Sequence, residues 1–205
     1  MRRKLAVGAL LFSLIGGMVA MGAPAAHADG PGVGSPWMVS VGDSAISGEA
    51  GRWAGNTNGS SGNVDALGPT AYYDNATNSA EQIPGCHRSK SAEVYLGDGV
   101  NGMNLACSGA RTYTQTPGSG DFKPGLDFYS DANGRKGQAL ALQQFAATHN
   151  VKAVTVLIGA NNYGFADIVQ TCIEDFLLSP SWWPDYCNDD SSVTSNFTSA
   201  NITAR

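Results

Sequence analysis

The sequence has few charged residues and no marked excess of positive charge. Charged residues make up 14% of the 205 residues, and 12 Lys and Arg against 17 Asp and Glu leave a formal net charge of −5. Proteins that bind nucleic acid or anionic lipid typically carry a clustered positive excess, which is missing here. We therefore expect no nucleic-acid partner.

Long apolar runs are missing as well, because no stretch of 18 apolar residues occurs after residue 28. A membrane-spanning helix needs about 20 such residues, so we expect no stable membrane anchor in the mature chain. Hydrophobic residues still make up 42% of the sequence, which is enough for a buried core. The 26 Gly and 9 Pro follow no triplet period, which excludes collagen and favours long loops. These features indicate a soluble globular chain of about one domain.

The first 28 residues have the pattern of a secretory signal peptide. Basic residues at 2–4 precede an apolar run at 5–19, and Ala26-His27-Ala28 provides the small residues of a cleavage site. An uncleaved membrane anchor is the alternative, but a cleavage site at this distance favours removal. We predict that 1–28 are removed, that 29–205 form the domain, and that the protein is secreted into the extracellular space.

Four cysteines in an exported chain predict two disulfides. Of the three possible pairings, we favour the local one, Cys86 with Cys107 and Cys172 with Cys187, which closes short loops. A metal site using Cys86, His87 and Cys107 is the alternative. Because no Cys-x-x-Cys pair occurs, we expect no metal.

Three short apolar segments are predicted strands, at 37–41, 102–107 and 151–158. A helix is predicted at 138–149, and a stronger one at 165–177 carries a continuous apolar stripe, which is typical of a helix lying on a sheet. Strands alternating with such helices predict an α/β fold with a parallel sheet covered on both faces. The stripe consists of Phe165, Ile168, Val169, Cys172, Ile173, Phe176 and Leu177.

An aromatic cluster follows the second helix. Trp182, Trp183 and Tyr186 precede Cys187 in a loop that we expect the disulfide to tether. Aromatic clusters of this kind more often pack than bind a ligand, so we expect packing.

Small or polar residues follow each predicted strand. In an open parallel sheet, ligands bind beyond the carboxyl ends of the strands. A hydroxyl, an accessible glycine N–H and a side-chain amide are the parts of an acyl-transfer site, in which the hydroxyl attacks and the donors stabilise the oxyanion. Each segment alone is an ordinary turn sequence, but the ordered set of three predicts a site. The segments are Gly42-Asp43-Ser44, Ser108-Gly109 and Gly159-Ala160-Asn161.

These segments resemble the blocks of the SGNH (GDSL) family of esterases and lipases. Residues 39–44 (VSVGDS) with 46–49 (ISGE) resemble the first block, 104–110 (NLACSGA) the second and 158–162 (IGANN) the third, and 86–89 (CHRS) resembles a segment of secreted bacterial members. The resemblance covers roughly 37–180. It implies a flavodoxin-like three-layer α/β/α fold, hydrolysis of carboxylic esters and no cofactor. It also implies that Ser44 is the nucleophile, with an oxyanion hole formed by Ser44, Gly109 and Asn161.

The chain departs from the family pattern in two respects. Asn162 stands where the family usually has Asp. The block Asp-x-x-His, which supplies the general base in this family, occurs nowhere in the sequence, and three strands are predicted where the family has five. His149 is predicted at the rim opposite Ser44, and His87 is a weak candidate beside an expected disulfide. We therefore expect an incomplete fold at the C-terminus, a base beyond residue 205, and an inactive or weakly active fragment.

Two functions remain open at this point. The first is a secreted serine hydrolase acting on a small-molecule, lipid or carbohydrate ester, whose acyl and alcohol groups stay open. The second is a secreted, non-catalytic module on the same fold that binds glycan or cell wall through its long loops and the Trp182-Trp183 pair.

Overall fold

The computed structural model describes residues 30–49, 68–116 and 122–204. The predicted signal peptide at 1–28 and the first part of the predicted loop region at 54–82 lie outside these residues. The predicted domain is described from residue 30 onward.

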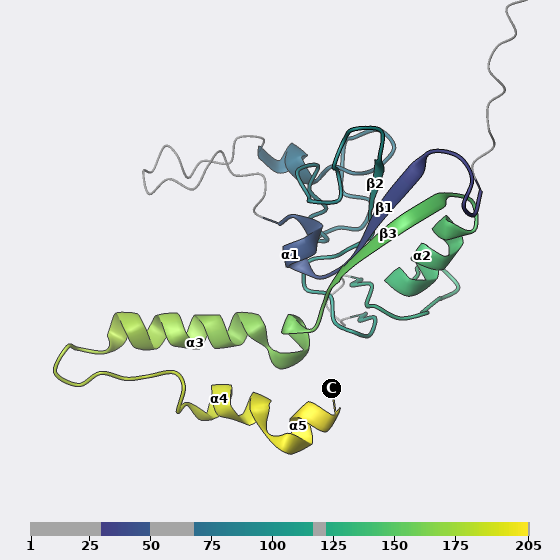
Figure 1. Ribbon diagram of the computed structural model, residues 1–205. Coiled ribbons are helices and arrows are strands. Elements are labelled where there is room, and N and C mark those ends of the chain that lie inside the picture. Colours follow the sequence, from purple (N-terminus) through teal and green to yellow (C-terminus); the bar gives the residue numbers. More distant parts are fainter. Residues whose placement is uncertain (1–29, 50–67, 117–121, 205) are drawn as a thin grey trace, which may run out of the picture.

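A three-stranded parallel sheet forms the centre of the molecule (Figure 1). Its strands are β1 (Pro36–Gly42), β2 (Asn101–Asn104) and β3 (Asn150–Leu157), in the order β2-β1-β3. The predicted α/β class with a parallel sheet is therefore confirmed. The strands at 37–41 and 151–158 were predicted to within one residue at each end.

The segment predicted as the second strand leaves the regular ladder at Asn104. The Asn104 side chain accepts a hydrogen bond from the N–H of Ala106 at 3.2 Å and donates to the Ser47 carbonyl at 3.0 Å. Hydrogen bonding to β1 nevertheless continues, since the Cys107 N–H donates to the Gly42 carbonyl at 3.0 Å. Asn104 thus joins the end of β2 to Ser47, the last residue of the short helix that follows β1.

The core surrounds β1, the central strand. Val39 and Val41 are fully buried, together with Ile46 of the short helix α1 (Ser44–Ser47). Helix α2 (Gln138–Ala146) packs on β1, where the rings of Trp37 and Phe145 meet edge to face at 5.0 Å. The predicted helix at 138–149 is confirmed, although it ends three residues early.

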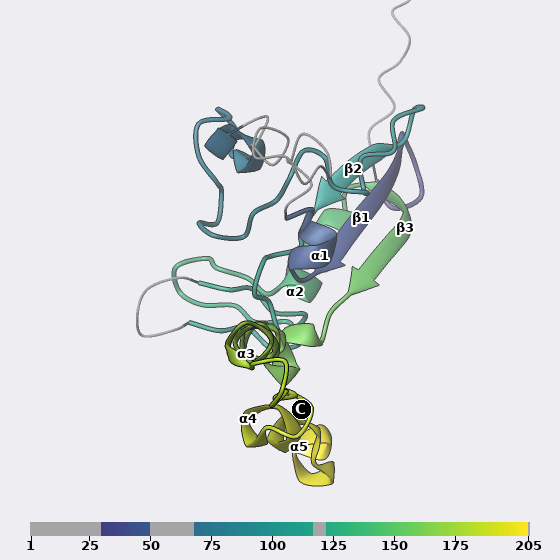
Figure 2. The ribbon, with the colours of Figure 1, turned by 90° about the vertical axis from the view of Figure 1, so that its left-hand side faces the viewer.

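Helix α3 (Phe165–Leu178) forms as predicted, but it does not lie on the sheet. Figures 1 and 2 show it beyond the carboxyl ends of the strands, crossing below α1. The chain then returns through α4 (Ser191–Thr194), η3 (Ser195–Phe197) and α5 (Ser199–Ala204). We call residues 165–204 the arm and the described residues up to 164 the body.

The expectation of a sheet covered on both faces is wrong for β3. Val156 and Leu157 are about half exposed, because β3 is an edge strand and α1 and α2 pack mainly on β1. The apolar stripe of α3 is largely exposed because this helix does not lie on the sheet. Packing was also the wrong prediction for the aromatic loop, since Trp182 is 83% and Trp183 is 76% exposed.

Both disulfides pair as predicted, Cys86 with Cys107 and Cys172 with Cys187. The alternative metal site is therefore wrong, because both of its sulfur ligands are used in a disulfide. Disulfides of this kind are compatible with an oxidising compartment. Within the described ranges, no helix combines the length and apolarity needed to cross a bilayer.

Candidate active site

One pocket of about 590 Å³ is lined by Ser44, Gly109 and Asn161, the three residues that the sequence placed at successive strand ends. They come from segments 52 or more positions apart in the chain. They meet because β1, β2 and β3 run parallel, so that their carboxyl ends reach the same edge of the sheet. The body supplies this polar side of the pocket.

Ser44 is the first residue of α1 and is separated from the end of β1 by Asp43 alone. The Asp43 side chain caps the helix by accepting a hydrogen bond from the Ala45 N–H at 3.2 Å, as expected for a residue that holds the turn. Burial raises the pKa of Asp43, although hydrogen bonds from the Ala45 and Asp43 backbone act against it. The Ser44 side chain is partly exposed, and its hydroxyl makes no hydrogen bond to a described residue.

The turn before Ser44 requires glycine at position 42. Gly42 has a φ of +144°, and a Cβ there would lie 1.9 Å from the Leu157 carbonyl oxygen. The close approach follows from pairing with β3, whose last carbonyl also accepts the Asp43 N–H at 2.9 Å. The end of β3 therefore fixes the backbone that carries Ser44.

Gln138 holds the same turn through its side chain, a role that the sequence did not predict. Its side chain is 1% exposed; the oxygen accepts from the Gly42 N–H, and the amide nitrogen donates to the Gly42 carbonyl at 2.9 Å and the Pro124 carbonyl at 2.8 Å. No local pattern signals this role, because Gln138 and Gly42 lie 96 positions apart.

Gly109 lies in a tight turn directly after the Cys86–Cys107 disulfide. The turn is closed by a hydrogen bond from the Ala110 N–H to the Cys107 carbonyl at 3.0 Å. Gly109 has a φ of +77°, which residues with a Cβ rarely adopt. Among the described residues, no acceptor pairs with its N–H, so that donor is available to the pocket.

Two asparagines of the short helix η2 (Ala160–Tyr163) hold the adjoining loop. Asn161 donates to the Ala110 carbonyl at 2.9 Å, and since an amide nitrogen carries two hydrogens, one remains for the pocket. Asn162 is buried; it accepts from the Thr112 N–H at 3.0 Å and donates to the Thr112 hydroxyl at 2.7 Å. Asn162, where the family pattern has Asp, therefore anchors the loop.

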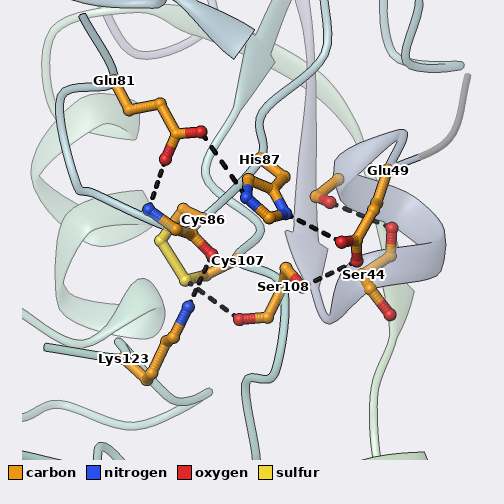
Figure 3. A network of polar contacts seen from close by, with 10 residues as sticks. Ser44, Glu49, Glu81, Cys86, His87, Cys107, Ser108 and Lys123 are labelled. Carbon is orange, nitrogen blue, oxygen red and sulfur yellow. Dashed lines mark hydrogen bonds and ion pairs between the residues drawn. A yellow bond between two sulfur atoms is a disulfide. The ribbon is translucent and has the colours of Figure 1, made fainter. Parts of the chain in front are cut away.

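Neither described histidine contacts Ser44. His149 lies at the amino ends of the strands, beside the Pro36–Asn150 pair, and its ring stacks on Phe145 at 3.8 Å. The Nδ1 of His87 lies 2.7 Å from a Glu49 carboxylate oxygen. Figure 3 shows the Glu49 carboxylate between the His87 ring and Ser44.

Glu49 is a second residue to which the sequence assigned no role. It lines the Ser44 pocket and accepts a hydrogen bond from the Ser108 hydroxyl at 2.7 Å. Burial acts to raise the pKa of Glu49, but hydrogen bonds from Ser108 and His87, with the charges of His87 and Lys123, outweigh it and lower that pKa. Glu49 is therefore ionised at neutral pH.

The other side of the pocket comes from the arm, where Gln170 and Glu174 lie beside an apolar surface. This surface is formed by Phe165, Val169 and Ile173, which follow one another along one face of α3. The pocket thus has a polar end at the sheet and an apolar wall along the helix.

One group of side chains in the described ranges has the spacing of metal ligands. One carboxylate oxygen each of Asp175, Asp185 and Asp190 lies within 4.8 Å of the others. Burial and these neighbouring carboxylates raise the pKa of Asp175. The group lies in the arm, apart from the residues that line the Ser44 pocket.

Comparisons with protein-family models, curated proteins and solved structures found no match to this chain. The candidate site therefore rests on its own geometry and chemistry.

Proposed function

We propose that this chain is a secreted serine ester hydrolase of the SGNH (GDSL) type. The observation that carries the proposal is that Ser44, Gly109 and Asn161, from three separate loops, line one pocket. The strand order β2-β1-β3 is in keeping with the start of a flavodoxin-like sheet, in which the order is 2-1-3-4-5. Two disulfides are in keeping with secretion.

In the proposed reaction the Ser44 hydroxyl oxygen attacks the carbonyl carbon of an ester and loses its proton to a base. The N–H groups of Ser44 and Gly109 and the second amide hydrogen of Asn161 donate to the oxyanion that forms. The tetrahedral intermediate then collapses, and the alcohol leaves with the proton. Water attacks the acyl-Ser44 intermediate in the same way and releases the acid.

The base is the part of this mechanism that the described residues do not supply at Ser44. His87 is bound to Glu49, and His149 lies at the opposite edge of the sheet. We therefore assign the role to a histidine outside the 205 residues, as the family pattern predicts. Without it, Ser44 stays a neutral alcohol and turnover is weak.

The apolar wall of the pocket favours the acyl group as the part of the substrate that lies along α3. Phe165, Val169 and Ile173 would contact an aliphatic chain whose carbonyl lies at Ser44. We therefore propose esters of apolar acids, rather than acetyl esters, as the substrate class.

The experiment uses added imidazole in place of the missing base. The 205-residue chain is treated with a fluorophosphonate probe with and without imidazole, and the labelled peptide is identified by mass spectrometry. We expect labelling at Ser44 that imidazole increases by roughly tenfold or more, as general-base catalysis contributes about 10²–10⁴-fold. Ser44→Ala should abolish it, and Ser91→Ala, an exposed serine, is the matched control. Labelling that survives Ser44→Ala would exclude Ser44 as the nucleophile.

A second candidate function, a glycan-binding module, is favoured by the exposed aromatic loop. Trp182, Trp183 and Tyr186 are all more than 60% exposed on a loop tethered by the Cys172–Cys187 disulfide. Aromatic faces of this kind stack on sugar rings. Tryptophan fluorescence titrated with soluble peptidoglycan fragments tests this candidate, and saturable quenching lost in Trp182→Ala would support it. A chain that binds these fragments but shows no Ser44-dependent labelling would be the module instead.

A further inference from the structure

Glu49 joins the segment that carries Ser44 to the two loops beside it. One oxygen of its carboxylate accepts from the Ser108 hydroxyl and the other pairs with Nδ1 of His87, each at 2.7 Å (Figure 3). We propose that Glu49 is a positioning residue that holds the Gly109 N–H in place at the Ser44 pocket. This inference rests on the proposed function.

The two partners of Glu49 occupy equivalent places in the chain. His87 directly follows Cys86, Ser108 directly follows Cys107, and the disulfide joins the two cysteines. The Ser108 N–H also donates to the Cys86 carbonyl at 2.9 Å. The disulfide therefore fixes the two loops to each other, and Glu49 fixes the joined loops to the end of α1.

The backbone hydrogen bonds that tie this segment to the sheet end before Gly109. The hydrogen bond from the Cys107 N–H to the Gly42 carbonyl, at 3.0 Å, is the last one between this segment and β1. Gly109 comes two residues later, in a turn at positive φ. The bond from the Ser108 side chain to Glu49 is the contact nearest to Gly109 that leads back to the Ser44 segment.

His87 is held firmly enough to orient the Glu49 carboxylate. Its φ of +49° is uncommon for a residue with a Cβ and persists only where surrounding contacts impose it. The ring stacks on buried Tyr72 at 4.7 Å, and its Nε2 faces a Glu81 oxygen at 3.7 Å. Glu49 thus accepts from a side chain that has little freedom to move.

The same partners make a carboxylate tolerable in a pocket that has to stabilise an oxyanion. An unpaired negative charge beside Ser44 would oppose the charge that develops on the substrate. In this structure, hydrogen bonds from Ser108 and His87 hold the Glu49 charge, and Lys123 lies close enough to lower the pKa of Glu49. Ionised Glu49 can only accept, which makes the Ser108 hydroxyl the donor.

The experiment compares Glu49→Ala and Glu49→Gln in the full chain, with imidazole as the base and a p-nitrophenyl ester as the substrate. Glutamine keeps an acceptor for Ser108 and offers a donor to His87, so it should preserve the arrangement. Glu93→Ala removes an exposed carboxylate outside the network and is the control. Amide hydrogen exchange at Ala110, whose N–H bonds the Cys107 carbonyl, reports the Gly109 turn independently of activity.

We expect Glu49→Ala to lower kcat on the order of 10–100-fold with KM changed about twofold at most, because an oxyanion donor is displaced. Ala110 exchange should accelerate on the order of tenfold, and Glu49→Gln should restore both values to within about threefold of the wild type, because the hydrogen bonds are kept.

Unchanged Ala110 exchange in Glu49→Ala would overturn the inference whatever the activity, and so would an unchanged kcat. If the wild type shows no Ser44-dependent turnover, the proposed function fails. The hydrogen-exchange measurement at Ala110 then still decides whether Glu49 holds the Gly109 turn.

Discussion

The body and the arm of this molecule differ in which side chains they bury and which they expose. In the body, buried polar groups such as Gln138, Asn104 and Asn162 each bond the backbone of a different segment. In the arm, the apolar residues of α3 are largely exposed to solvent, and Phe176 is 80% exposed. The body is therefore held by long-range contacts, whereas α3 contacts mainly its sequence neighbours η2 and α4.

The difference teaches that a strong local pattern does not by itself create a packed element. The stripe of α3 is the clearest helical pattern in the sequence, yet it buries none of its own residues. The polar residues that hold the body have no distinctive pattern around them. We expect the stability of this chain to come from the long-range contacts of the body rather than from the local pattern of α3, and three predictions test this expectation.

The largest effect is expected at Gln138. Gln138→Ala removes the partners of the Gly42 N–H and the Pro124 carbonyl, while the Gly42 carbonyl keeps only the Cys107 N–H. Buried polar groups left without partners cost about 1–3 kcal/mol each, so we expect the free energy of unfolding to fall by about 3 kcal/mol or more. Urea denaturation followed by circular dichroism measures this.

The matched control in the arm is Gln170→Ala. Gln170 is exposed, and among the described residues its side chain bonds only Glu174, at 2.7 Å, so its removal should change the free energy of unfolding by less than about 0.5 kcal/mol. Equal losses for the two glutamines would remove the distinction between body and arm.

A smaller effect is expected from truncating apolar residues. Val39→Ala in the buried centre of β1 should cost about 2 kcal/mol of unfolding free energy, through lost burial and the cavity left behind. Phe176→Ala removes a larger side chain but should cost less than about 0.5 kcal/mol, because that side chain is already in water. The same denaturation measurement applies, and a larger loss for Phe176 would mean that α3 is packed in solution.

The smallest and most specific effect is a pH dependence of opposite sign in the two regions. The pKa of Glu49 is lowered in the folded protein, so ionised Glu49 stabilises the fold. This contribution to the free energy of unfolding is present above the ordinary glutamate pKa of about 4.3 and is lost as the pH falls through the lowered value. The pKa of Asp175 is raised, so ionised Asp175 destabilises the folded arm. This destabilisation is removed as the pH falls through the raised pKa and Asp175 is protonated.

Hydrogen-exchange protection factors measured between pH 7 and about pH 3 follow both regions at once. Protection at Ala110 should fall only at the acid end, and protection in α3 near Asp175 should rise before it does. Parallel changes in both regions would contradict the assignment of Glu49 and Asp175 to opposite signs.

The three strands, the helices α2 and α3 and the disulfide pairing followed from the sequence because local signals determine them. The β-branched run at 151–158 and the stripe at 165–177 carry their periods within a few residues. Grouping Ser44, Gly109 and Asn161 needed only the rule that parallel strands end at one edge of the sheet. Each of these inferences depends on neighbours in the chain or on a general property of parallel sheets.

The contacts that hold the site could not be predicted in the same way. Glu49 meets Ser108 across 59 positions and Gln138 meets Gly42 across 96, and neither pairing leaves a mark on the surrounding residues. The exposure of α3 depends on what lies opposite its stripe, which the stripe itself does not specify. Glu49, Gln138 and α3 therefore needed the structure.

Gln138 also limits how this chain can vary. Its side-chain amide offers a donor and an acceptor side by side and pairs with both polar groups of Gly42, much as one residue of a further strand would. Glutamate lacks the donor, and asparagine is one methylene too short. A residue inserted within the first turn of α2 would rotate its neighbours by about 100° and withdraw the amide. Related sequences should therefore keep glutamine at this position, whereas we expect the positions of the exposed Gln143 and Gln144 of the same helix to vary.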